Sequence, residues 1–276
     1  MTNAKKYVAI LLSGFVLFEL SLLFGITDYN IFLNISNQQS VFGNIMEILG
    51  ELVAPYLFAL SGIILALYYN SQPSDYEGKT YKAILGIVYM IAGIGYSIIV
   101  LNRFHNFWYS LIGIVITGVL FTITIYLFKK LSPQRLFQLY CIALTAIVYM
   151  ISVLIIINII KVFWGRVRPR DLETVADFTP WYKPNGITGN RSFPSGHTAN
   201  AAILYIITMF APLTKKKPVK VLLYTVSILW IVFMAFSRVY FGAHFASDVL
   251  YGATISIIIF YLSKYFTLRY IAKSLQ

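Results

Sequence analysis

Repeated long apolar runs constrain the fold of this chain more than any other feature. Eight runs occur, at about residues 7–26, 52–70, 83–101, 108–128, 139–160, 197–213, 219–236 and 249–266. Each has roughly the 17–25 residues that an α-helix needs to cross the hydrocarbon core of a bilayer. Because backbone polar groups in lipid must be paired within the chain, the runs predict an all-α, polytopic transmembrane bundle of about eight spans.

Composition agrees with a membrane protein. Hydrophobic residues make up 59% of the chain, whereas soluble domains average roughly 45–50%. The single cysteine, Cys141, excludes a disulfide within the chain and a thiolate metal cluster.

The basic residues predict the orientation of the bundle. The net charge is +12, and with both termini in the cytoplasm most Lys and Arg fall in short inner loops such as 215–217. The positive-inside rule and contacts with anionic membrane lipids explain this excess better than a nucleic-acid partner. Eight basic residues nevertheless fall in outer segments, seven of them within 161–196 and 237–248. These two segments predict an anionic ligand on the extracytoplasmic side of a cell membrane.

Segment 237–248 contains the residues of a candidate nucleophilic site. His244 and Asp248 are four residues apart, so a helix that begins near Ala243 would place them on one face. A carboxylate that binds one imidazole nitrogen leaves the other nitrogen free as a nucleophile. Arg238 adds a positive charge for an anion. The alternative interpretation is a histidine that is hydrogen-bonded at the membrane interface.

A second basic segment follows the fifth apolar run. Lys161 and Arg168 are seven residues apart, nearly two helical turns, and would project the same way from a helix that Pro169 ends. The alternative is a cluster of basic side chains that extend to the membrane edge.

The third segment, Pro194-Ser195-Gly196-His197, precedes the sixth run. Ser195 is a suitable N-cap for a helix, and Gly196 permits close approach of a ligand to the backbone. A helix start also favours a phosphate. The alternative is a capped helix with a histidine of no function.

Together these segments resemble the signature of the type 2 phosphatidic acid phosphatases (PAP2), K-x6-RP, PSGH and SR-x5-H-x3-D, with every defining position present. The resemblance implies that His244 is the nucleophile, that Asp248 orients it, and that His197 is the acid that protonates the leaving oxygen. It also implies that Lys161, Arg168, Ser195, Gly196 and Arg238 hold the phosphate oxygens. The third histidine, His105, lies outside the motifs and is predicted to have no role.

The implied function is an integral membrane lipid-phosphate phosphatase that forms a phosphohistidine and needs no cofactor. Candidate substrates are undecaprenyl diphosphate, phosphatidylglycerophosphate and phosphatidic acid. A metal bound by His244 and Asp248 is an alternative, but three nearby cations would repel it. Two further alternatives are a lipid phosphotransferase with an acceptor other than water and a non-catalytic lipid-binding or transport protein.

The resemblance also divides the chain. Residues 139–276 are predicted to form the PAP2-like catalytic core, and residues 1–138 an N-terminal transmembrane region. The family's membrane form usually has six spans, so the N-terminal region is expected to contain an extra hairpin. A short interfacial helix is expected within 31–49. The aromatic residues of loop 171–193, including Trp181, predict either a membrane anchor or a gate over the lipid entrance. The sequence predicts no oligomeric state.

Overall fold

A computed structural model describes residues 3–102 and 107–274, and within these ranges the chain forms eight α-helices and no strand. The predicted all-α fold is confirmed. The helices are α1 (Asn3–Ile35), α2 (Val41–Asn70), α3 (Lys79–Leu101), α4 (Phe107–Lys129), α5 (Pro133–Trp164), α6 (Gly196–Ala202), α7 (Lys217–Tyr240) and α8 (Ala246–Ser274). A 3-10 helix, η4 (Ile203–Leu213), continues α6, and two short ones, η2 (Pro169–Asp171) and η3 (Val175–Asp177), lie in the loop after α5.

Seven helical segments within the described residues are long and apolar enough to cross a membrane: those of α1, α2, α3, α5, α7 and α8, and α6 together with η4. They indicate a multi-pass membrane protein. Helix α4 is also 23 residues long and apolar, but several of its side chains lie outside the part that the structure describes. The number of eight spans and the orientation of the termini therefore stay predictions.

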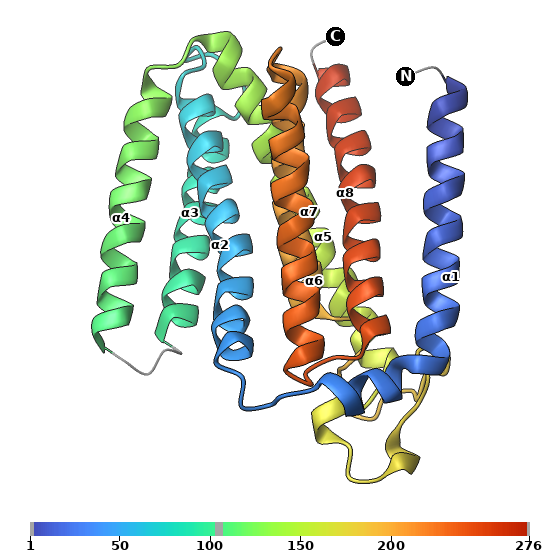
Figure 1. Ribbon diagram of the computed structural model, residues 1–276. Coiled ribbons are helices and arrows are strands. Elements are labelled where there is room, and N and C mark those ends of the chain that lie inside the picture. The colour runs from blue at the N-terminus through green and yellow to red at the C-terminus, as the bar shows by residue number, and fades with distance from the viewer. Residues whose placement is uncertain (1–2, 103–106, 275–276) are drawn as a thin grey trace.

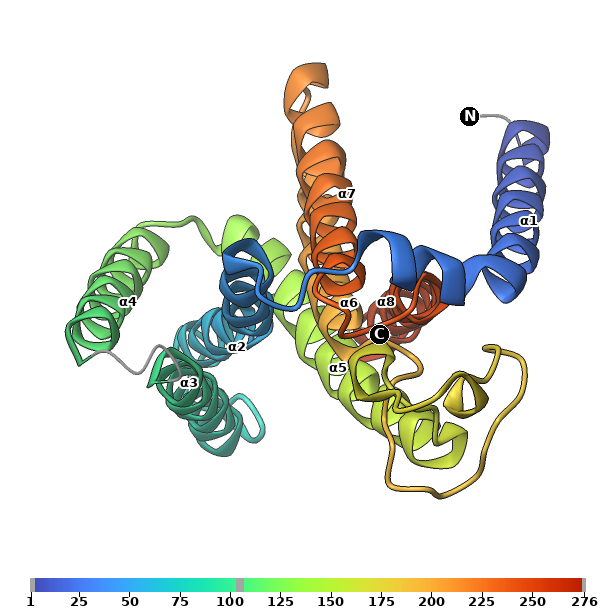
Figure 2. The same ribbon diagram turned by 60° about the horizontal axis from the view of Figure 1, so that its bottom comes forward.

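The helices pack as one central group with a flank on each side. Figures 1 and 2 show α2, α5, α6, α7 and α8 in the middle, the α3–α4 pair on one side and α1 on the other. The start of α1 and the end of α8 lie at the same end of the bundle. In the centre, the Tyr149 hydroxyl on α5 donates to the Ala202 carbonyl at 3.0 Å and contacts Ser256 Oγ on α8 at 2.8 Å. These buried bonds fix α6 between α5 and α8.

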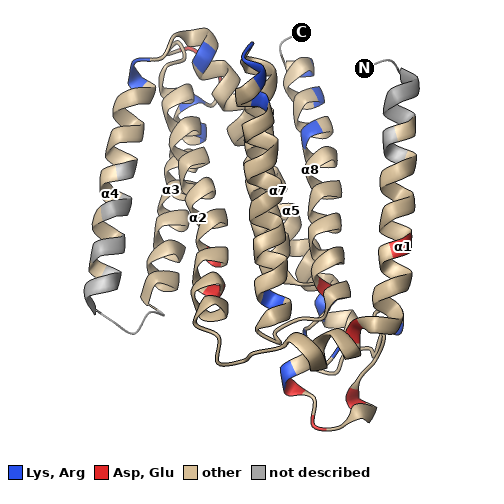
Figure 3. Ribbon diagram, viewed as in Figure 1, with Lys and Arg blue, Asp and Glu red and all other residues tan. Residues whose placement is uncertain are grey.

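Basic residues gather at one end of the bundle. Figure 3 shows mainly Lys and Arg, with little Asp or Glu, at the end where α1 starts and α8 finishes, whereas the opposite end has residues of both signs. The basic residues at the end where α8 finishes include those of the turns 129–135 and 215–220. This segregation is the pattern expected if that end faces the cytoplasm.

Glycines bring α2 and α3 into close contact. A Cβ atom on Gly62 would lie 2.5 Å from the Gly86 carbonyl oxygen, and one on Gly86 would lie 2.7 Å from the Ala66 backbone nitrogen. Only hydrogen fits at these positions, so the two backbones pack directly against each other.

The short interfacial helix expected within 31–49 does not form as an element of its own, because residues 31–35 end α1 and residues 41–49 begin α2. Helix α1 continues to Ile35, and Ser40 caps α2 by accepting the Gly43 N–H at 3.1 Å. The last part of α1 changes direction and runs across the lower end of the bundle (Figure 1). There the Asn37 N–H donates to the Tyr240 carbonyl at 2.6 Å. This bond ties the link between α1 and α2 to the end of α7.

Candidate active site

The turn between α7 and α8 positions the candidate nucleophile. His244 lies in this turn, because α8 begins three residues after the predicted start at Ala243. Gly242 has a φ of 69°, a left-handed conformation that favours glycine. The backbone N–H groups of Ala243 and His244 both donate to the Arg238 carbonyl, at 3.0 and 3.3 Å. The turn, rather than a helix, therefore fixes the imidazole.

Asp248 still meets His244, as the spacing predicted. It lies in the first turn of α8, and its Oδ2 atom is 3.5 Å from Nδ1 of His244. This distance exceeds a normal hydrogen bond, and Nδ1 has no other partner among the described residues. Oδ2 also accepts the Phe245 N–H at 3.0 Å and the Ser192 hydroxyl at 2.5 Å. Because Nδ1 faces Asp248, Nε2 is the nitrogen that remains for a substrate.

A buried ion network holds Asp248 from the other side. Nη1 of Arg166 donates to Oδ1 of Asp248 at 2.7 Å, and Nη2 donates to Oδ2 of Asp28 at 3.0 Å. All three side chains are fully buried. Asp28 comes from α1 and also accepts bonds from the N–H and the hydroxyl of Ser247. Our sequence prediction did not include Arg166 or Asp28 in the site, although Arg166 falls in the basic outer segment 161–196 that predicted an anionic ligand.

His244 is electrically neutral in this environment. The ring is 2% exposed, and burial lowers its pKa to about 3, with Lys161 and Arg168 acting in the same direction and Asp248 in opposition. A neutral imidazole keeps the lone pair that a nucleophile needs.

A cavity of about 340 Å³ brings five of the eight predicted site residues together: Lys161, Arg168, Gly196, His197 and His244. The α5 helix ends at Trp164 and Gly165 caps it with a φ of 56°, so Arg168 reaches the cavity from the loop and not from the predicted helix. A Cβ on Gly196 would be 3.3 Å from Cε of Lys161. Glycine at this position leaves room for the lysine.

His197 has a carboxylate partner that the sequence did not reveal. Its Nε2 atom lies 3.1 Å from Oε1 of Glu51, on α2. Both residues line the cavity, and the His197 and His244 ring centres are 6.5 Å apart. The two histidines therefore face one shared space from α6 and from the turn before α8.

The other three predicted residues lie behind the cavity wall. Ser195 is the N-cap of α6, as expected, and its N–H donates to the Asp248 carbonyl at 2.8 Å. Gly252 permits this contact, since a Cβ there would be 2.5 Å from the Ser195 carbonyl oxygen. Arg238 is buried and donates to Glu47 Oε2 at 3.1 Å. Asp248 acts on the cavity through His244.

Loop 171–193 packs against two helices. The Trp181 indole N–H donates to the Ser21 carbonyl on α1 at 2.9 Å, and its ring lies 4.5 Å from that of Tyr251 on α8. Phe178 packs against Phe245 with ring centres 5.3 Å apart. The roles of anchor and gate both stay predictions. His105 lies outside the described residues.

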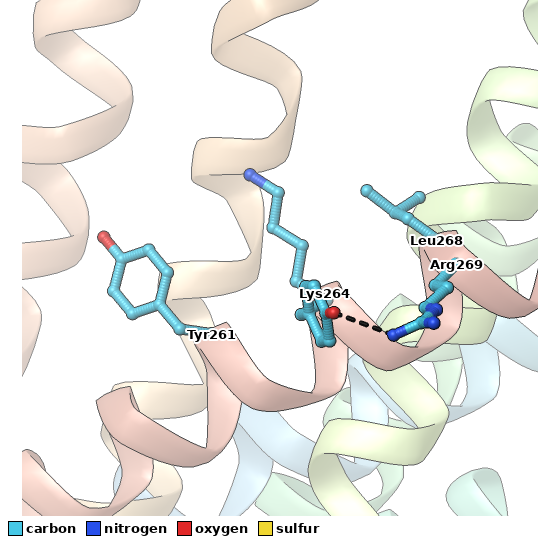
Figure 4. A pocket seen from close by; sticks show the side chains of 5 residues that line it. Tyr261, Lys264, Leu268 and Arg269 are labelled. Carbon is cyan, nitrogen blue, oxygen red and sulfur yellow. Dashed lines mark hydrogen bonds between the residues drawn. The ribbon is translucent and has the colours of Figure 1, made fainter. Parts of the chain in front are cut away.

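A second surface hollow lies on α8, far along the helix from the turn that holds His244. Figure 4 shows it lined by Tyr261, Lys264, Leu268 and Arg269, with Tyr265 accepting a hydrogen bond from Arg269 at 3.0 Å. All its residues come from one helix, and none is a histidine or a carboxylate. It therefore lacks the groups that the candidate active site combines.

Fold and site together define a multi-pass helical membrane protein with a cation- and histidine-lined cavity. Residues 142–271 match the sequence model of the PAP2 superfamily, and this part of the chain belongs to that superfamily. All eight residues predicted for the site lie within the matched range.

Two curated relatives agree with this assignment. Phosphatidylglycerophosphatase B of Bacillus subtilis (strain 168) is 34% identical over 114 residues, 40% of this chain and 50% of the relative. Lipid A 4'-phosphatase of Rhizobium leguminosarum is 31% identical over 112 residues, 39% of this chain and 46% of the relative. The chain thus spans about half the length of the curated relatives that it matches. No solved structure gives a significant match.

Proposed function

We propose that this chain is a membrane lipid-phosphate phosphatase that acts through a phosphohistidine on His244. The observation that carries the proposal is the single cavity lined by His244, His197, Lys161 and Arg168. A neutral nucleophile, a second histidine and two cations are the groups that phosphoryl transfer requires, since this reaction depends on positioning and charge stabilisation.

The first step transfers the phosphoryl group to the protein. Lys161 and Arg168 bind the phosphate oxygens. The lone pair on Nε2 of His244 forms the N–P bond while the bond from phosphorus to the lipid oxygen breaks. His197 gives its proton to that leaving oxygen, which departs as an alcohol or as a phosphate.

Water completes the cycle in the second step. His197, now without its proton, accepts a proton from a water molecule whose oxygen forms the new P–O bond. The P–N bond breaks, inorganic phosphate leaves, and His244 is neutral again. Asp248, held by Arg166, keeps the His244 ring in place through both steps.

Ser195, Gly196 and Arg238 complete the proposed phosphate site. Gly196 lines the cavity, whereas Ser195 and Arg238 are buried behind it. Arg238 is paired with Glu47, so it reaches a phosphate oxygen only if that pairing opens. To bind the phosphate, Arg238 therefore has to exchange the carboxylate of Glu47 for a phosphate oxygen.

An apolar groove next to the cavity supports a lipid substrate. This groove of about 330 Å³ includes Pro55, Phe58, Ala92, Met150 and Ile203, and it shares Glu51, Tyr96, Leu154 and Asn200 with the cationic cavity. The continuity suits a molecule with a phosphate head and a hydrocarbon tail. Candidates are undecaprenyl diphosphate, phosphatidylglycerophosphate and phosphatidic acid, and the name of one relative adds the 4'-phosphate of lipid A.

The wall of the groove provides a test of tail binding. Ala92→Trp on α3 would fill the groove, so we expect KM to rise for long-chain lipid phosphates and to stay unchanged for a short soluble phosphate. Val88→Trp is the matched control, because Val88 is on the same helix and 51% exposed. An equal effect of both variants would argue against tail binding here.

Phosphate release from a panel of these lipids by the purified protein tests the proposed function. Wild-type protein should release phosphate without an added acceptor, and chelators should leave the rate unchanged, since no metal takes part. Release only with an acceptor would favour the phosphotransferase, and an inert protein would favour a binding or transport role. Membrane-impermeant labelling of cysteines introduced at 161, 197 and 244, one at a time, tests the proposed extracytoplasmic face.

A further inference from the structure

The acidic residues of segment 27–51 pair with residues of the PAP2 region, by which we mean the matched residues 142–271. This segment contains Asp28, Glu47 and Glu51 and no Lys or Arg. Asp28 pairs with Arg166 at 3.0 Å, Glu47 with Arg238 at 3.1 Å and Glu51 with His197 at 3.1 Å. The segment lies outside the matched residues 142–271. Carboxylates from α1 and α2 therefore reach a site whose motifs come from the other half of the chain.

Close helix packing brings Glu51 to His197. A Cβ on Gly50 would lie 2.4 Å from Cε of Met234 on α7 and 3.8 Å from Cδ2 of His197. Because glycine has no side chain, α2 approaches α6 and α7 closely at this level. The next residue, Glu51, is then within hydrogen-bond distance of the imidazole.

The setting of Glu51 separates it from the other two carboxylates. Its side chain is 13% exposed, and it lines the cavity with His197, Lys161 and His244. Asp28 is fully buried, and Glu47 does not line the cavity. Glu51 and His197 thus form a second histidine–carboxylate pair in the same cavity as His244, which has its own partner in Asp248.

We propose that Glu51 is a positioning residue for the acid–base step. It holds Nε2 of His197, so Nδ1 is the nitrogen directed to the leaving oxygen. A carboxylate that fixes the orientation and tautomer of a catalytic imidazole is a general means of making proton transfer efficient. This inference rests on the proposed phosphatase function and adds a residue that the PAP2 motifs do not contain.

The leaving group of the substrate makes the proposal testable. A lipid phosphate releases an alkoxide-like oxygen that needs a proton, whereas p-nitrophenyl phosphate releases a stable phenolate that does not. Loss of correct acid positioning should therefore reduce kcat/KM for the lipid far more than for the aryl ester. The parameter kcat/KM is informative because it includes only the steps up to formation of the phosphohistidine.

Glu51→Gln should lower kcat/KM for a lipid phosphate by about 10- to 100-fold, which is less than the roughly 10²- to 10⁴-fold that a complete general acid contributes, because His197 itself remains. For p-nitrophenyl phosphate we expect a change of less than about threefold. Glu51→Asp should recover part of the loss, because it restores a carboxylate. Glu77→Gln is the matched control, since Glu77 is exposed in the turn between α2 and α3. Unfolding temperatures of the variants in detergent report any loss of folding.

Three outcomes overturn the proposal. Equal losses for both substrates would mean that Glu51 supports the fold only. A rise in activity would mean that Glu51 is a resident anion that competes with the phosphate. An unchanged rate for both would mean that the pair has no role. Wild-type protein that is inactive on every lipid and on the aryl ester would instead overturn the proposed function, and the role of Glu51 with it.

Discussion

The PAP2 region contributes the basic residues of the candidate site together with the carboxylate of Asp248, whereas helices α1 and α2 contribute three further carboxylates. Residues 142–271 provide both histidines and the basic residues Lys161, Arg166, Arg168 and Arg238. Helices α1 and α2 provide the carboxylates Asp28, Glu47 and Glu51, which pair with three of these residues. The charge balance of the site is therefore completed by helices that the family match does not include.

The three N-terminal carboxylates also differ from one another. Asp28 and its partner Arg166 are fully buried, whereas the Glu47 side chain is 34% exposed and that of Glu51 is 13% exposed. Removing one partner of a buried ion pair leaves an uncompensated charge, but an exposed pair contributes little. We infer a structural role for Asp28, a role in the cavity for Glu51 and an action through Arg238 for Glu47.

The largest expected effect lies in the PAP2 region. His244→Ala removes the proposed nucleophile, so phosphate release should fall by about 10⁴-fold or more. The measurement is phosphate release from the best lipid of the panel, together with detection of phosphohistidine on the protein. If a variant of α1 or α2 that still folds had an equal effect, the division of roles between the two regions would be wrong.

The next effect tests the junction between the regions. Arg166→Leu leaves Asp28 and Asp248 buried without their cation and should destabilise the protein by about 3–5 kcal/mol. Asp28→Asn keeps the bond between Arg166 and Asp248 and should cost less, about 1–3 kcal/mol. Unfolding in detergent measures both values. If Asp28→Asn lowered the free energy of unfolding more than Arg166→Leu does, the stability of the network would depend mainly on the carboxylate from α1.

A third prediction concerns pH. The folded state holds the pKa of His244 at about 3, below the unfolded value of about 6.5. The unfolded chain therefore binds more protons, and stability is lost as pH falls from about 6.5 towards 3. His244→Gln removes this effect. Between pH 7 and 4.5 the free energy of unfolding of this variant should therefore fall by about 2 kcal/mol less than that of the wild type. Parallel losses in unfolding experiments would contradict the burial of this histidine.

The smallest effect belongs to Glu47. Its carboxylate neutralises Arg238, so Glu47→Gln should free the guanidinium and lower KM for a phosphate substrate by about two- to fivefold. Steady-state kinetics with one lipid phosphate measure this change, and Glu77→Gln is again the control. A higher KM would show that Glu47 positions Arg238 and does not compete with the substrate.

The sequence by itself determined the class of fold and the chemistry of the motifs. Apolar runs of the length of a bilayer predict helices because this signal is local, and the N-cap at Ser195 was predicted for the same reason. The spacing of His244 and Asp248 also predicted their contact, although a turn forms it in place of a helix.

Only the tertiary structure decided which distant residues meet. Glu51 and His197 are 146 residues apart, and Asp28 and Arg166 are 138 apart. No local pattern encodes these pairs, because they depend on how closely α2 packs against α6 and α7 and on where the end of α1 crosses the bundle. Side-chain packing fixes those distances, and packing is a property of the whole fold.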